Sequence, residues 1–111
     1  MKIIIVGAGV VGSRLASICC EDGHAVVVIE PDHEAATAVA EACDALVLNA
    51  NITDADIMEQ AGADKADSLI ATTGDDAKNL MAIVLARDAN IDSMVAHHLL
   101  KLAERERDKE Q

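Results

Sequence analysis

Short runs of branched aliphatic residues alternate with segments of helical pattern along nearly the whole chain, and this alternation limits the fold more than any other feature. The first run, Lys2–Val6, is continuous, which is typical of a strand buried on both faces of a parallel sheet. Further strands are predicted at 25–29, 45–48, 68–72 and 94–96. Since parallel neighbours need right-handed crossovers, the sequence predicts an α/β fold, a Rossmann-like doubly wound sheet of five strands in the order 3-2-1-4-5 with helices on both faces.

The helices between these strands carry start and stop signals. Asp32 and Thr53 are predicted N-caps, and Gly23 and Gly62 follow helices as stops. Helices are predicted at 10–21, 33–43, 54–61, from Asp75 or Asp76 to 87, and from 99 onward. We therefore expect one domain over residues 1–98, followed by a charged helix or tail at 99–111.

The composition excludes several classes of function. The chain has no Phe, Tyr or Trp, and its net charge of -11 disfavours binding to nucleic acid. No apolar run reaches the ~20 residues of a membrane span, so direct insertion is not expected. The three cysteines, an odd number without a C-x-x-C pattern, are interpreted as reduced thiols of a cytoplasmic protein, with at least one of Cys19 and Cys20 in the core.

Three glycines follow the first predicted strand in the spacing G-x-G-x-x-G. Gly7 is suited to a sharp exit from the strand, Gly9 to close approach of a pyrophosphate, and Gly12 to close packing of helix on sheet. The N–H groups and the positive dipole end of the following helix then face the phosphates. The alternative is a tight turn that binds nothing.

An acidic residue, Glu30, ends the second predicted strand. Its place after the glycines suits hydrogen bonding to ribose hydroxyls, and its charge repels a 2′-phosphate, which favours NAD or an adenosine nucleotide over NADP. Arg14 has two interpretations, a phosphate contact or, preferred, a surface ion pair. His33 is expected in solvent or near the adenine edge.

Catalytic and metal-binding patterns are not apparent. The neighbouring His97 and His98 would point to opposite faces of a strand, and no His/Cys/carboxylate cluster has metal-ligand spacing. No Ser or Cys lies in a G-x-S-x-G elbow. We therefore predict neither a catalytic residue nor a metal site.

Linked segments resemble the N-terminal regulator domain of potassium transport systems, called the RCK, KTN or TrkA-N domain, as in Trk- and Ktr-type regulators. The resemblance covers residues 1 to about 98, and its most specific parts are the A-G-x-x-x-A-D run at 61–67 and the T-G-D-D…N run at 73–79. It implies a domain that binds NAD(H) or ATP/ADP at the carboxyl ends of the strands. Ala50 and His97 depart from the family pattern, which usually has Gly and Arg there.

The resemblance also implies the residues of the site. Phosphates are assigned to the glycine loop, the adenosine ribose to Glu30, the adenine to the segment at Asn51, and further contacts to the loop after the fourth strand and the helix behind it. The full set of expected cofactor-binding residues is Gly7, Gly9, Val10, Val11, Gly12, Glu30, Asn51, Ile52, Thr73, Gly74 and Asn79.

The preferred function is a nucleotide-sensing cytoplasmic subunit that controls a membrane potassium transporter or channel, to which it binds peripherally. A homodimer or higher homo-oligomer is expected. The candidate self-association residues are Met81, Ile83, Val84, Met94 and Leu99. Two alternatives are the coenzyme half of an NAD-dependent oxidoreductase and a non-binding, for instance engineered, Rossmann scaffold. Since about fourteen residues follow the fifth predicted strand, a catalytic domain is not expected.

Overall fold

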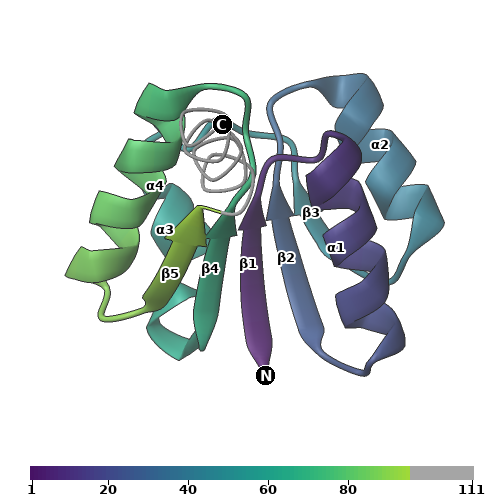
Figure 1. Cartoon of the computed structure of the whole chain (residues 1–111), viewed down its shortest axis with the longest axis horizontal. Helices are drawn as coiled ribbons and strands as arrows, with labels where there is room; N and C mark the ends of the chain where they lie inside the picture. The colour runs from purple at the N-terminus through teal and green to yellow at the C-terminus, as the bar shows by residue number, and fades with distance from the viewer. Residues whose placement is uncertain (96–111) are drawn as a thin grey trace, which may run out of the picture.

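The computed structural model describes residues 1–95 as a five-stranded parallel sheet in the order β3-β2-β1-β4-β5, which confirms the predicted topology. In chain order the elements are β1 (Lys2–Val6), α1 (Val10–Glu21), β2 (Ala25–Ile29), α2 (His33–Ala42), β3 (Leu46–Leu48), α3 (Ile57–Gln60), the 3-10 helix η1 (Ala63–Lys65), β4 (Ser68–Ala71), α4 (Asp76–Asp88) and β5 (Asp92–Val95). Every strand pairing is parallel, so all strands run toward the same end of the sheet, as the arrows of β1, β2, β4 and β5 show in Figure 1.

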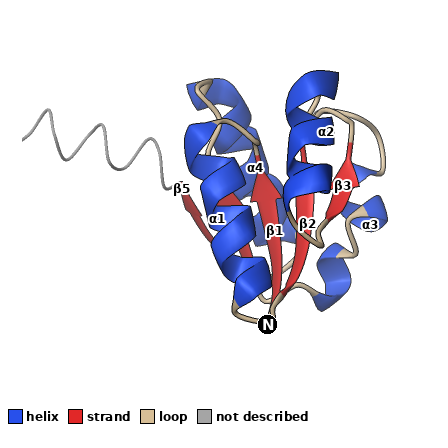
Figure 2. Ribbon diagram, turned by 90° about the vertical axis from the view of Figure 1, so that its right-hand side faces the viewer, coloured by secondary structure: helices blue, strands red, loops and turns tan. Residues whose placement is uncertain are grey.

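The sheet separates two helical layers. Helices α1 and α2 cover one face, and α3 and α4 cover the other (Figures 1 and 2). This division follows from the strand order, because right-handed crossovers that run in opposite directions along a sheet lie on opposite faces. The chain is therefore a three-layer α/β domain.

The fully buried core on both faces is aliphatic, and Met58 and the cysteines pack at its margins. Ile4 and Leu69 are fully buried on the side of α3 and α4, while Ile5 and Val28 are fully buried beneath α1 and α2. Helices α1 and α4 present Ala16, Ala82 and other small residues to the sheet. Small side chains let the helices pack close to the strands, so a core without aromatic rings still leaves little empty space.

The carboxyl ends of the three central strands lie at one level. Val6 of β1 is in register with Ile29 of β2 and with Ala71 of β4. The next residue of each strand, Gly7, Glu30 or Thr72, therefore emerges at the same edge, where the chain direction switches between β1 and β4. Ligands of doubly wound sheets bind at this kind of position.

Two predicted elements differ from the structure. The helix predicted at 54–61 is reduced to Ile57–Gln60, and Thr53 is not its N-cap, because Asp56 in a left-handed conformation (φ 61°) precedes it. The preceding segment forms local side-chain turns instead: Asp54 Oδ2 accepts the Asn51 N–H at 2.9 Å, and Asn51 Oδ1 accepts the Thr53 N–H at 3.3 Å. The fifth strand spans 92–95, two residues earlier in its start than predicted.

The predictions for His97, His98, Leu99 and the tail at 99–111 lie outside the described residues. Within residues 1–95, no helix has both the length and the apolar character needed to cross a bilayer.

Candidate functional site

Two of the three motif glycines are required by the fold itself. Gly7 has a φ of +107°, and a Cβ there would lie 2.8 Å from Thr72 Oγ1. A Cβ on Gly12 would overlap the Gly7 carbonyl oxygen, because the first turn of α1 lies directly on the end of β1. Both positions therefore permit only glycine, as the sequence predicted for the strand exit and the helix packing.

Gly9 is different, because the folded chain does not need it. Its backbone is extended, with φ -74° and ψ -157°, and a Cβ there would have no atom within 4 Å. Gly9 is also the N-cap of α1, and no side chain caps the free N–H groups of Val10, Val11 and Gly12. The structure thus presents bare main-chain donors at the positive end of a helix dipole, next to open space.

Glu30 connects the glycine turn to the turn after β2. The Ala8 N–H donates to Glu30 Oε1 at 2.7 Å, and the Asp32 N–H donates to Glu30 Oε2 at 2.9 Å. The sequence predicted a ribose-binding carboxylate here, but did not predict these main-chain contacts. Each carboxylate oxygen has a second lone-pair site, so the group can still accept a hydroxyl hydrogen bond.

Asn49 fixes the turn on which Glu30 is placed. Its Nδ2 donates to the carbonyl oxygens of Glu30 and Pro31, each at 3.0 Å. The Asn49 Oδ1 atom lies 3.3 Å from Nδ1 of His33, and His33 is exposed to solvent. Asn49 was not predicted as a site residue. The sequence signal that could have identified Asn49 is its position as a polar residue directly after the third strand.

The loop after β4 is held by Asn79, which is only 2% exposed. Asn79 Oδ1 accepts the Thr73 N–H at 3.1 Å and the Thr73 hydroxyl at 2.7 Å, and Asn79 Nδ2 donates to the Thr73 carbonyl at 2.9 Å. Its side chain is thus fully engaged with the loop. Asn79 positions Thr73 and does not line the cleft.

These elements enclose a cleft of about 290 Å³ at the carboxyl edge of the sheet. Its lining brings together many of the expected residues: Gly7, Gly9, Glu30, Asn51, Ile52, Thr73 and Gly74. Lining residues that were not predicted are Val6, Ile29, Pro31, Thr72, Asp75 and Lys78. Lys78 is the only cation among the lining side chains. It lies in the first turn of α4, which begins after the N-cap Asp75.

The remaining expected residues lie around the cleft. Val11 and Gly12 belong to the first turn of α1, with Gly12 buried against the sheet. Val10 and Arg14 instead line a second hollow, which is bounded by residues of α1 and α2. The phosphate interpretation of Arg14 therefore has no support from its position, since Arg14 does not line the cleft.

The cysteines lie at the far ends of α1 and α2. All three are free, and they pack against the core beneath these helices, as predicted for Cys19 or Cys20. Burial and a hydrogen-bonding contact with Cys43 raise the pKa of Cys20 from 9.0 to about 11. No cluster of His, Cys, Asp or Glu in residues 1–95 could hold a metal ion.

A doubly wound parallel sheet with a glycine turn, a bare helix N-terminus and an acidic residue after β2 defines the class of Rossmann-like nucleotide-binding domains. The family model of the TrkA-N domain matches residues 3–106. The chain belongs to the TrkA-N domain family, in agreement with the resemblance of its motifs.

Relatives agree with this assignment, and a solved structure has the same fold. The chain is 38% identical over 96 residues to a Trk system potassium uptake protein TrkA homolog of Methanothermobacter thermautotrophicus, covering 86% of this chain and 44% of the relative. It is 38% identical over 90 residues to the homolog of Pyrococcus abyssi, covering 81% and 40%. The Kef CTD of Shewanella denitrificans, in an AMP-bound form, has the same fold, with a TM-score of 0.65 and 20% identity over 84% of this chain and 57% of that one. The chain thus spans less than half the length of these two relatives.

Proposed function

We propose that the chain binds an adenine nucleotide, NAD(H) or ATP/ADP, in the cleft at the carboxyl edge of the sheet. The observation that carries this proposal is Gly9: the fold leaves its Cβ position empty and the adjacent N–H groups of α1 uncapped. A phosphate placed there would receive main-chain hydrogen bonds without a basic side chain.

The rest of the cleft suits the adenosine half of such a ligand. The free lone pairs of Glu30 accept ribose hydroxyls, and the neighbouring Pro31 and Ile52 offer an apolar surface to a base. AMP in the Kef CTD, a domain of the same fold, supports an adenine nucleotide over other anions. The negative charge of Glu30 repels a 2′-phosphate, so NADP is expected to bind more weakly than the other nucleotides.

The binding event is proposed to be regulatory. Relatives bear the name Trk system potassium uptake protein, so the partner is a membrane potassium transporter or channel subunit that the domain binds from the cytoplasm. A nucleotide that binds one arrangement of the assembled subunits better than another shifts the transporter toward the matching state. A homo-oligomer is part of the proposal, and helix α4 offers Met81 and Val84, exposed by 42% and 49%, as contact residues.

Thermal unfolding with a panel of nucleotides tests the proposal. NADH, NAD, ATP, ADP and AMP are compared with NADPH, and a ligand at about 100 times its Kd adds about 2.7 kcal/mol to the free energy of unfolding. At least one adenine nucleotide without a 2′-phosphate is expected to raise the Tm. No stabilisation by any of them would contradict the proposal.

Substitution of Gly9 by alanine makes the test specific to the site. Gly9→Ala is expected to leave the Tm of the free protein unchanged, since the new Cβ meets no atom, and to weaken nucleotide binding at least about tenfold. Gly12→Ala is the contrasting variant, because its Cβ overlaps the Gly7 carbonyl and should lower stability by about 3 kcal/mol. Thr37→Ala, at an exposed position of α2 that lines neither hollow, is the control for both. Unaltered binding by Gly9→Ala would remove the phosphate from this loop.

A further inference from the structure

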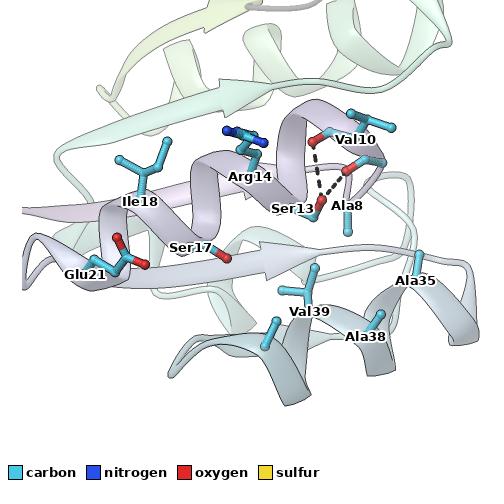
Figure 3. Close-up of a pocket in the computed structure, with 12 residues that line it drawn as sticks. Ala8, Val10, Ser13, Arg14, Ser17, Ile18, Glu21, Ala35, Ala38 and Val39 are labelled. Atoms are coloured by element: carbon cyan, nitrogen blue, oxygen red, sulfur yellow. Dashed lines mark hydrogen bonds between the residues drawn. The ribbon is translucent and has the colours of Figure 1, made fainter.

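A second hollow, larger than the nucleotide cleft, lies away from it. It is a groove of about 800 Å³ between α1 and α2, and α2 contributes only small or aliphatic side chains to it, Ala35, Ala38, Val39 and Ala42 (Figure 3). Short side chains on α2 leave room for another helix to approach closely.

Helix α1 presents two large apolar side chains on this side. Val10 is 86% exposed and Ile18 is 48% exposed, although Val and Ile are among the residue types most often buried in a core. Arg14 and Glu21 are exposed beside them, and within residues 1–95 neither forms an ion pair. We call Val10, Arg14, Ser17, Ile18 and Glu21 the α1 stripe.

The charges of the α1 stripe are complementary to those of an antiparallel second copy of the same stripe. Arg14 and Glu21 are equally far from a point between Ser17 and Ile18, and seven residues separate them, about two helical turns or ~10 Å. When two copies of α1 cross antiparallel at that point, Arg14 of each copy meets Glu21 of the other. A two-fold interface requires this kind of reciprocal contact.

We propose that the α1 stripe is a docking surface for a second copy of this chain, in an antiparallel, two-fold arrangement of α1 against α1. Ile18 from each copy lies near the axis, and the alanines of α2 accommodate the neighbouring helix. The proposal goes beyond the regulatory function, and it concerns a different surface from the exposed residues of α4.

Charge selects this occupant over others. A basic helix would pair with Glu21 but would be repelled by Arg14, and an acidic helix would meet the reverse conflict. Only a partner with the opposite order of charge along its axis satisfies both residues, and an antiparallel copy has that order. The net charge of -11 on each copy opposes association, so the contact is expected to be weak and specific.

Charge reversal of the full chain tests the arrangement by sedimentation equilibrium. All variants carry Val84→Glu, which disables the exposed face of α4, and nucleotide is absent. The parent chain is expected to dimerise. Arg14→Glu and Glu21→Arg should each weaken the dimer by at least about tenfold, because symmetry places the like-charge contact twice in each interface.

Mixing the two charge-reversal variants provides the decisive experiment. Arg14→Glu carries two negative groups and Glu21→Arg two positive groups, so an equimolar mixture should form a heterodimer, and the double reversal should restore the homodimer. Circular dichroism and Tm verify that each variant folds. A monomeric parent, reversals without effect, or a mixture that does not associate would overturn the proposal. So would a dimer lost on deletion of residues 99–111, which would assign the contact to that segment. Failure of nucleotide binding would leave these results unaffected.

Discussion

The side chain of Asn79 forms three hydrogen bonds, all to Thr73, from a position that is almost fully buried. Asn79→Ala leaves the Thr73 N–H and carbonyl without partners, so we expect the free energy of unfolding to fall by about 2–3 kcal/mol. Urea denaturation measures the loss. Asn79→Asp keeps the acceptor but places a buried carboxylate oxygen against the Thr73 carbonyl oxygen, so near neutral pH it should cost more than alanine. Equal losses for the two variants would contradict this assignment of the bonds.

The charge of Glu30 should determine which nucleotides bind. Glu30→Arg is expected to weaken NAD binding by about tenfold or more and to improve binding of NADP relative to NAD, because the site then attracts the 2′-phosphate. Isothermal titration with both ligands gives the ratio. Glu34→Arg, an exposed change of the same charge in the first turn of α2, is the matched control. Unchanged NAD affinity in Glu30→Arg would place the ribose elsewhere.

At this scale the sequence predicted residues whose function follows from type and spacing. Gly7 and Gly12 lie where the motif requires them, and Glu30 lies within reach of the glycine turn. The inward orientation of Asn79 and the clamp formed by Asn49 were not predictable, because both depend on which loop the fold brings beside each amide. The ligand contacts of these residues stay predictions.

Helices α2 and α4 both begin at an aspartate that accepts main-chain hydrogen bonds. Asp75 Oδ1 accepts the N–H groups of Ala77 at 2.9 Å and Lys78 at 3.2 Å, and Asp32 Oδ2 accepts that of Ala35 at 3.1 Å. Alanine at either cap should lower stability by about 1 kcal/mol.

Asparagine at the same positions separates the cap from the charge. Asp75→Asn keeps the acceptor oxygen, so thermal unfolding should show most of the stability retained, with a small loss from the helix dipole. If Asp75→Ala and Asp75→Asn were equally destabilised, the interaction would be with the dipole alone. Glu34→Ala, in the first turn of α2 without a capping role, serves for comparison.

The caps also explain which helices were predicted well. Asp32 precedes a helix of ten residues and Asp75 one of thirteen, and both were found where the signals indicated. Thr53 has the right residue type, but the neighbouring Asn51 and Asp54 use their side chains in turns of their own. Cap preferences alone do not decide between a helix and such turns.

The stability of the whole domain should depend on alkaline pH through Cys20. In the folded chain its pKa is raised to about 11 from 9.0, so the unfolded chain loses this proton first. Stability is therefore complete below about pH 9 and declines as the pH rises toward 11. Denaturation of the wild type and Cys20→Ala at pH 8 and pH 10.5 tests this, and the decline should be smaller in the variant. Equal declines would assign the effect to other groups.

The fold of the whole molecule was the most predictable level. Buried strands, right-handed crossovers and the switch between β1 and β4 follow from general rules of chain connection, and the strand order agrees with them. The α1–α2 groove was not predicted. Its shape depends on how two helices splay over the sheet, and the sequence pattern of each helix does not contain that information.

A core packed without a single ring has a practical consequence for spectroscopy. With no Trp, Tyr or Phe in the chain, the protein is nearly transparent at 280 nm and emits no fluorescence of its own. In a titration with NADH, all absorbance near 340 nm and all blue emission belong to the dinucleotide. Its emission and polarisation therefore report occupancy directly, without energy transfer from a tryptophan of the protein.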